Sequence, residues 1–193
     1  MDINPLNLIA SSVFTILFLS SALLPTNSQQ FSRKLSKEEM GIKRETLSHL
    51  HFYFHDIGSG SNPTAVHVAQ AATTNSSSSL FGAASVIDDR LTEGPQISSK
   101  TVGRAQGMYI FADSTQVALS VLYNFVFTEG KFNGSVLSIL GRNPMSSAVR
   151  ELVIVGGSGV FRFARGYAEA RTISMNMQTG DAMVEYNLYV FHH

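Results

Sequence analysis

The feature that most constrains the fold of this chain is a series of short segments in which apolar and polar side chains alternate. In residues 117–127, every second side chain is large and apolar or aromatic: Val117, Leu119, Val121, Tyr123, Phe125 and Phe127. A period of two places such side chains on one face of a β-strand. The turn-forming residues 129–134 then lead into a further strand candidate at 135–140, which predicts a β-hairpin.

Similar strand candidates follow one another from residue 49 to the C-terminus: 49–57, 64–69, 81–88, 107–112, 152–155, 160–164, 167–174 and 182–191. Turns rich in Gly, Asn and Ser separate them, and no convincing helix interrupts them. This pattern favours an all-β fold, either an antiparallel barrel or a sandwich. A barrel leaves no exposed strand edge, and its inward face can line a ligand cavity.

Length and composition narrow the class of protein. The 193 residues suit one domain, and 13 Phe with only 15% charged residues favour a compact core. Because the formal net charge is zero, we expect no nucleic-acid partner. The absence of Cys excludes disulfides, thiolate chemistry and cysteine-ligated zinc.

The N-terminal region predicts export from the cell. Residues 6–24 are mostly apolar, and 25–28 break the run with small and polar side chains. We interpret 1–28 as a secretory signal peptide in preference to a membrane anchor. Residues 29–48 form a polar arm of mixed charge, and 49–193 form the folded domain. Sequons at Asn75 and Asn133 fit a secreted glycoprotein.

One acid stands out in the first strand candidate. Alternation in 49–57 places Leu50, Phe52, Phe54 and Asp56 on one face. A carboxylate at the end of an apolar face is costly to bury unless it is paired or protonated. Asp56 therefore either caps the turn at 57–60 or acts as a catalytic acid or base at the mouth of a cavity.

Other constellations are weaker. His49, His51 and His55 share a strand face, which raises the question of a metal site, but no HExxH or similar pairing accompanies them. We interpret them as polar-face histidines and predict neither a metal nor a cofactor. The sequence Asp88-Asp89-Arg90 reads as the end of a strand. A catalytic interpretation requires Asp56 and an arginine to meet inside the barrel.

Four stretches together resemble plant dirigent proteins: 51–57 (HFYFHDI), 86–95 (VIDDRLTEGP), 102–109 (VGRAQGMY) and 153–168 (VIVGGSGVFRFARGYA). Their order and spacing match across residues 50–193. The resemblance implies an eight-stranded antiparallel β-barrel of the dirigent and allene oxide cyclase type, assembled as a homotrimer. It also implies secretion to the apoplast and cell wall, and binding of an aromatic substrate.

Lignan-type dirigent proteins direct the coupling of two monolignol radicals, which a separate laccase or peroxidase generates, and assist closure of a quinone methide. By this resemblance Asp56 and Arg150 are the expected catalytic residues. The residues expected to contact substrate are Phe54, Tyr109, Phe111 and Asn143. Two of these depart from the family pattern, because Asn143 stands where that pattern has a second Asp, and Phe111 where it has a Tyr.

These departures matter because Asn143 can hydrogen-bond a phenol but cannot take its proton. The residues around Asn143 and at 161–166 look more like those of the pterocarpan synthase branch. Enzymes of that branch dehydrate an isoflavanol to a quinone methide and close the ring. Three functions stay open: stereoselective radical coupling that needs a separate oxidase, an autonomous dehydratase-cyclase acting on an isoflavan-4-ol, and a cell-wall scaffold for lignin deposition. The sequence is thus compatible with both an enzyme and a non-oxidising binding protein.

Overall fold

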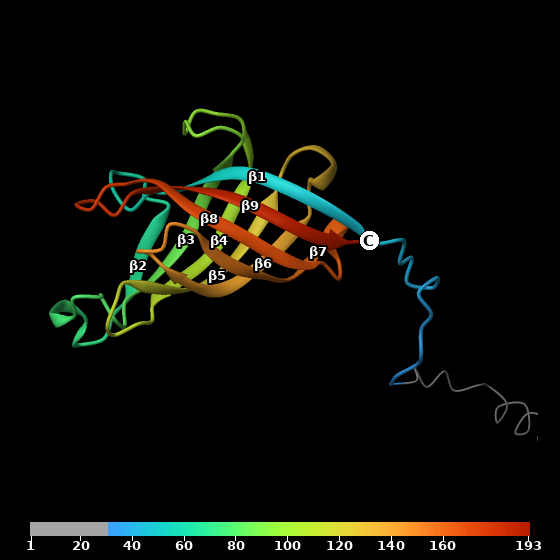
Figure 1. Cartoon of the computed structure of the whole chain (residues 1–193), viewed down its shortest axis with the longest axis horizontal. Helices are drawn as coiled ribbons and strands as arrows, with labels where there is room; N and C mark the ends of the chain where they lie inside the picture. Colours follow the sequence, from blue (N-terminus) through green and yellow to red (C-terminus); the bar gives the residue numbers. More distant parts are fainter. Residues whose placement is uncertain (1–30) are drawn as a thin grey trace, which may run out of the picture. The chain divides into compact units, whose positions relative to one another are not determined.

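The computed structural model describes residues 31–193 (Figure 1). The predicted signal peptide at 1–28 lies outside the described residues. By its internal contacts the chain divides after Gly41, and the barrel belongs to the unit Ile42–His193. In residues 31–193 no helix is both long enough and apolar enough to cross a lipid bilayer.

The described part contains nine β-strands: β1 (Thr46–Asp56), β2 (Ala65–Ala69), β3 (Ala84–Thr92), β4 (Thr101–Phe111), β5 (Ala118–Phe127), β6 (Val136–Pro144), β7 (Arg150–Ser158), β8 (Arg165–Met175) and β9 (Ala182–His192). Three single-turn 3-10 helices lie between them: η1 (Thr74–Ser76), η2 (Gly130–Phe132) and η3 (Gly159–Phe161). Neighbouring strands in the described residues pair in antiparallel fashion throughout.

Eight of these strands close into a ring, which confirms the predicted eight-stranded antiparallel barrel. The order runs β1-β9-β8-β7-β6-β5-β4-β3, and a β1–β3 pairing closes it. The short β2 lies outside the ring and pairs with the first half of β3. The β1–β3 seam is short, from Tyr53↔Thr92 to His55↔Arg90, whereas β1 pairs with β9 along its whole length.

The predicted alternation accounts for the core. Leu50, Phe52 and Phe54 of β1 are buried, as are the inward residues of β5. Phe52 and Phe125 meet edge to face with ring centroids 5.1 Å apart, and Tyr186 of β9 packs against both. Aromatic pairs in such geometries add stabilisation beyond the apolar area that they bury.

Several strand boundaries differ from the sequence prediction. The segment 160–164 is not a strand, because Gly159–Phe161 forms a 3-10 turn that buries Phe161 against Phe132, with centroids 4.8 Å apart. Phe161 thus reaches the core from a turn, while Val160 and Phe163 are exposed, a division that periodicity does not reveal. β3 continues to Thr92, so Asp89 lies within a strand and not at its end.

Of the polar arm predicted at 29–48, the structure describes residues from 31 onward. Residues 31–41 are exposed and contain one turn. Ser36 Oγ accepts from the Glu39 backbone N–H at 3.1 Å, and Glu39 Oε2 accepts from the Ser36 N–H at 2.8 Å. This reciprocal pair is a capping box. β1 begins at Thr46, so the last three residues assigned to the arm belong to the barrel.

Candidate functional site

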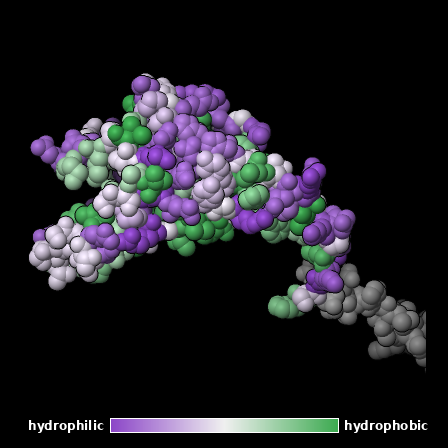
Figure 2. Space-filling view, in the orientation of Figure 1, coloured by the Kyte–Doolittle hydropathy of each residue, from purple (hydrophilic) through white to green (hydrophobic). Residues whose placement is uncertain are grey.

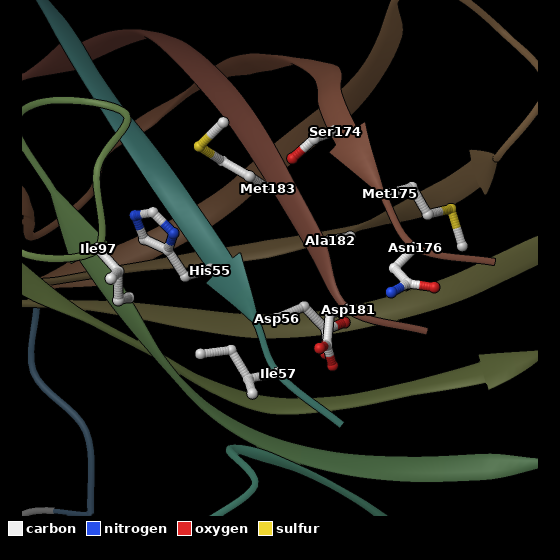
Figure 3. Close-up of a pocket in the computed structure, with 10 residues that line it drawn as sticks. All are labelled: His55, Asp56, Ile57, Ile97, Ser174, Met175, Asn176, Asp181, Ala182 and Met183. Atoms are coloured by element: carbon white, nitrogen blue, oxygen red, sulfur yellow. The ribbon is translucent and has the colours of Figure 1, made fainter. Parts of the chain in front are cut away.

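Asp56 ends β1 on the inward side, two residues beyond the buried Phe54. It lines a pocket of about 410 Å³ together with residues of the β8–β9 hairpin, among them Asp181 and Met183. Figure 3 shows the Asp56 and Asp181 carboxyl groups side by side in this pocket. Of the site residues predicted from sequence, Asp56 alone lines it.

The surroundings of Asp56 favour its protonated form. Burial is the main cause, and the neighbouring negative charge of Asp181 adds to it, so that the pKa of Asp56 is raised to about 6. An interaction with the Tyr109 hydroxyl partly opposes this rise. A carboxyl group with a pKa near 6 can both give and take a proton at neutral pH, which general acid–base catalysis requires.

Asp181 also holds the loop that follows β1. Its Oδ1 accepts hydrogen bonds from the backbone N–H groups of Gly58 at 2.9 Å and Ser59 at 3.0 Å. The turn after Asp56 is thus capped by Asp181 and not by Asp56. The bonds from the Ser59 hydroxyl and the loop backbone keep the pKa of Asp181 below its usual range.

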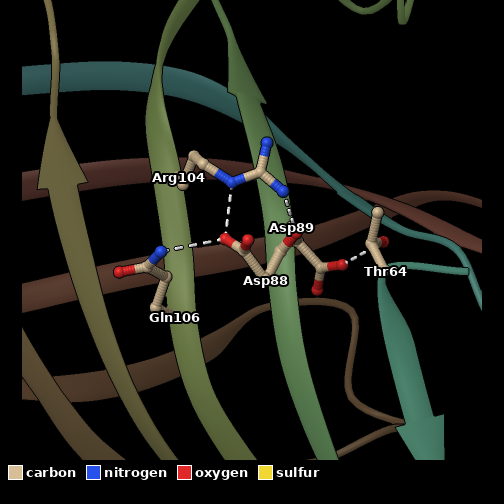
Figure 4. A network of polar contacts seen from close by, with 5 residues as sticks. All are labelled: Thr64, Asp88, Asp89, Arg104 and Gln106. Carbon is tan, nitrogen blue, oxygen red and sulfur yellow. Dashed lines mark hydrogen bonds and ion pairs between the residues drawn. The ribbon is translucent and has the colours of Figure 1, made fainter.

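A second buried acid, Asp89 on β3, was not singled out as a site residue from the sequence. Its side chain is fully buried, and Oδ1 accepts a short hydrogen bond from the Thr64 hydroxyl. Oδ2 has no hydrogen-bond partner among the described residues. Burial and the charge of Asp56 raise the pKa of Asp89 to about 8. Figure 4 shows Asp89 directed toward Thr64, while Asp88 turns the other way toward Arg104 and Gln106.

Tyr109 of β4 links this region to the barrel wall. Its phenol interacts with Asp56 and with the Ser85 hydroxyl, and burial raises its pKa to about 12. Phe111 lies two residues further along the same face, with its ring centroid 6.1 Å from that of Tyr109. Both side chains are half-buried, so Phe111 contributes an apolar wall without a hydroxyl.

Arg150 and Asn143 form a separate buried pair. The Arg150 Nε–H donates to Asn143 Oδ1 at 3.0 Å, and both side chains are nearly fully buried. Since Asn143 is neutral, it does not compensate the guanidinium charge, and no ion pair with Arg150 occurs among residues 31–193. Burial lowers the pKa of Arg150, while Tyr186 and Tyr123 oppose this effect.

The structure does not bring Asp56 and Arg150 into direct contact. Two buried tyrosines interact with both groups. The charge of Arg150 lowers the pKa of Tyr186, and the charge of Asp56 raises it. The charge of Asp56 also raises the pKa of Tyr123, and Tyr123 in turn acts to raise the pKa of Arg150. Phe54 packs between these tyrosines, with centroids 5.8 Å from each. The site thus has a negative end and a positive end with phenols between them.

Sequence reasoning missed four of these residues: Asp89, Tyr123, Asp181 and Tyr186. A signal for Asp89 was present, because Ser85, Ile87, Asp89 and Leu91 share a face once β3 extends to Thr92. All four are buried. Ending the strand at residue 88 concealed this pattern.

The three histidines of β1 each have their own partner. His49 bonds Asn187 at 2.9 Å, His51 bonds Glu185 at 2.8 Å, and His55 bonds the Thr92 hydroxyl at 2.8 Å. Within residues 31–193, no cluster of three or more His, Cys, Asp or Glu side chains could hold a metal ion.

The structure thus defines a closed antiparallel β-barrel with an aromatic interior, a raised-pKa carboxyl group at one end and a buried arginine that has no acidic partner among the described residues. Comparison with known proteins agrees with this assignment. Residues 47–191 match the family described as Dirigent-like protein. The chain belongs to the dirigent family.

Relatives span nearly the whole chain. Dirigent protein 21 of Arabidopsis thaliana is 51% identical over 180 residues, covering 93% of this chain and 94% of the relative. Pterocarpan synthase 1 of Glycyrrhiza echinata is 43% identical over 185 residues, covering 95% and 98%.

A solved structure of a pterocarpan synthase is also similar to this chain. The pterocarpan synthase dirigent protein GePTS1 superposes with a TM-score of 0.74 and 48% identity, over 78% of this chain and 87% of that one. The similarity therefore includes the pterocarpan synthase branch of the family.

Proposed function

We propose that this protein binds a phenolic substrate and controls the stereochemistry with which a quinone methide closes. We propose further that it forms this intermediate itself, as a dehydratase-cyclase acting on an isoflavan-4-ol without an oxidase. The observation that carries the proposal is Asp56, a half-buried carboxyl group with a pKa near 6 that lines a pocket. The similarity to pterocarpan synthases supports this choice of substrate class.

In this reaction Asp56 protonates the leaving hydroxyl group, which departs as water. Arg150 stabilises the negative charge that develops on the phenolic oxygen as the quinone methide forms, and Asn143 holds its guanidinium in place. The aromatic interior excludes water, which would otherwise trap the quinone methide. A second phenolic hydroxyl of the same substrate then closes the ring.

The experiment uses the purified protein with a racemic isoflavan-4-ol and no oxidase, followed by chiral chromatography. Enantiomerically enriched ring-closed product is the expected result, and its absence refutes the dehydratase function. Asp56→Asn should retain the fold and lose turnover. Asp88→Asn is the matched control, because Asp88 is an acid of the barrel wall that pairs with Arg104 and is largely exposed.

Stereoselective radical coupling is the second candidate function. Dirigent protein 21 matches with higher identity than the pterocarpan synthase of Glycyrrhiza echinata, which favours the broader dirigent activity. Coupling requires a laccase or peroxidase to generate radicals, so adding a laccase and coniferyl alcohol separates the two functions. Product that depends on the oxidant supports coupling.

We also propose that the chain assembles as a trimer through an apolar row on the outside of the barrel. The row crosses five strands as cross-strand neighbours: Val66↔Val86, Val86↔Met108, Met108↔Leu122 and Leu122↔Leu140. Most of these side chains are about half exposed, Leu122 at 52%. Figure 2 shows hydrophobic residues at the surface of the barrel among hydrophilic ones. Light scattering on the wild type and on Leu122→Glu tests the assembly, and a monomeric wild type would exclude it.

Secretion to the apoplast is part of the same proposal. The Asn75 and Asn133 side chains of the two sequons are exposed, which is compatible with attached glycans. A mass shift on glycosidase treatment of protein purified from plant tissue tests both secretion and glycan occupancy.

A further inference from the structure

Asp89 is a fully buried acid that takes no direct part in the proposed dehydration. The β1–β3 register runs Tyr53↔Thr92, Phe54↔Leu91 and His55↔Arg90. The seam ends there, and continuing the same register by one step would set Asp56 opposite Asp89. The two acids are close enough for the charge of Asp56 to raise the pKa of Asp89. Phe54 and Leu91 are both buried, so the alternation puts the two acids on the same inward face. Directly opposed residues of antiparallel strands have Cβ atoms about 5 Å apart.

Two carboxyl groups at this spacing in a buried site do not ionise independently, because two negative charges there repel each other strongly. Asp89 is the more deeply buried of the two, and its Oδ2 lacks a partner in the described structure. An ionised carboxylate with an unsatisfied buried oxygen is strongly disfavoured. The proton is therefore retained on Asp89 while Asp56, which reaches the pocket, ionises first.

We propose that Asp56 and Asp89 share a single proton and that Asp89 is a positioning residue that acts on the substrate through Asp56. The proposal rests on the dehydratase-cyclase function. Asp89 is not itself a catalytic residue, because it is fully buried and does not reach the pocket. Its part is to keep one proton available to the pair at neutral pH.

The proton accounting closes over one turnover. The shared proton moves from Asp89 to Asp56 and then to the leaving hydroxyl group. The C–O bond breaks, the oxygen keeps the electron pair, and the hydroxyl group departs as water. The phenol that becomes the quinone methide carbonyl lies at the Arg150 end, so it releases its proton to solvent, and its oxygen takes one back from solvent on ring closure. Ring closure forms a new C–O bond, and the attacking phenol releases its proton to the pair. The pair ends with one proton, and no oxidant is consumed.

Other groups around the pair also influence its titration. Asp181, in the loop before β9, and Tyr109 of β4 act on Asp56. Asp88 of β3 and Arg104 of β4 act on Asp89. The pair in turn raises the pKa values of Tyr123 of β5 and Tyr186 of β9. The tyrosine pKa values are raised by burial, so these phenols stay neutral over the working range. Asp181 is ionised throughout that range, because its pKa is lowered. His55 of β1 is directed to the other face, where it bonds Thr92, and burial lowers its pKa. On the inward face, Asp56 and Asp89 are therefore the groups expected to change charge between pH 6 and 8.

The first test is the pH profile of kcat/KM. With pKa values of about 6 and 8, the population of the singly protonated pair is equal at pH 6.5 and pH 7.5. Wild-type kcat/KM should thus be nearly the same at both. Asp89→Asn leaves Asp56 alone as the acid, so its activity should fall by roughly eightfold between these pH values. Asp88→Asn, on the other face of β3, should follow the wild type.

A merely structural role for Asp89 would lower activity by the same factor at every pH, and a variant profile parallel to that of the wild type would overturn the proposal. The second test needs no substrate: ¹³C NMR of labelled aspartate carboxyl groups should show one of the pair titrating near pH 6 and the other near pH 8. In Asp56→Asn the Asp89 titration should move to lower pH. Completion of both titrations below pH 5 overturns the shared proton.

The two tests also separate this proposal from the function on which it rests. If the wild type shows no dehydratase activity at any pH, the proposed function fails and the catalytic role of the pair fails with it. The NMR titration then still decides whether the proton is shared. If activity is present and the variant profile is parallel, only the role of Asp89 is wrong.

Discussion

The burial of Asp89 predicts a specific dependence of stability on pH. An ordinary Asp has a pKa of 3.8, and in the folded barrel the pKa of Asp89 is raised to about 8. Between these values the native state holds one proton more than the unfolded state at this residue. Stability contributed by this proton is therefore fully present below pH 3.8, falls as the pH rises, and stops falling above pH 8.

The slope follows from linkage. One proton corresponds to about 1.36 kcal/mol per pH unit, so from pH 5 to pH 7 the wild type should lose about 2.7 kcal/mol at this site. Asp89→Asn removes the titration and retains an acceptor for Thr64. From pH 5 to pH 7, the unfolding free energy of the variant should therefore rise by this amount relative to that of the wild type. Asp56 titrates in both proteins, so its contribution largely cancels.

Denaturant unfolding at one protein concentration, at pH 5, 6 and 7, measures this difference. Asp88→Asn is the control, because the bond from Arg104 lowers the pKa of Asp88 and it stays ionised in both states over this range. Its stability curve should run parallel to that of the wild type. Parallel curves for Asp89→Asn as well, within about 0.5 kcal/mol, would refute the buried protonated state of Asp89.

Two further predictions concern the other polar groups of the site. Arg150→Met should abolish turnover. The unfolding free energy should stay unchanged or rise by about 1–4 kcal/mol, because the variant replaces a buried charge that has no acidic partner. A large loss of stability in denaturant unfolding would instead show that Arg150 has a structural role. Tyr109→Phe removes the interaction that lowers the pKa of Asp56, so this pKa should rise above about 6. The carboxyl titration by NMR measures that shift, and an unchanged titration would show that the Tyr109 hydroxyl has no such effect.

Alternation was sufficient for the all-β class because it is a local property, whereas the choice of an eight-stranded barrel over a sandwich came from the family resemblance. Residues 117–127 and 182–191 were predicted as strands within one or two residues, and the inward side chains of β1 were assigned to the correct face. Local patterns did not locate the end of β3. Charged residues in succession at 88–90 look like a turn, whereas a partly exposed strand next to a short closing seam can hold Asp88 outside and Asp89 inside.

The site was less predictable for a related reason. Asp56 was found because an acid at the end of an apolar face is conspicuous within one strand. The relation between Asp56, Asp89 and Asp181 depends on three separate strands or hairpins, and only the closed barrel brings them together. Family resemblance supplied Arg150 and Asn143, but it gave no sign that Asn143 leaves a buried guanidinium uncompensated.

That uncompensated charge leads to a prediction about Asn143 itself. With Asp89 protonated and Asp56 ionised, the interior holds one negative charge at the pocket and one positive charge at Arg150, separated by neutral phenols. At present the Arg150 Nε–H donates to the Asn143 amide oxygen at 3.0 Å. Asn143→Asp would put a carboxylate oxygen in the place of this amide oxygen. The resulting ion pair would compete with the substrate phenolate for the guanidinium. We expect dehydratase turnover to fall roughly hundredfold, as for the loss of one oxyanion donor, while the fold is retained. The same variant restores the second acid of the lignan-type pattern, so oxidase-dependent coupling of coniferyl alcohol should become detectable. Undiminished dehydratase turnover in Asn143→Asp would show that Arg150 does not stabilise the phenolate.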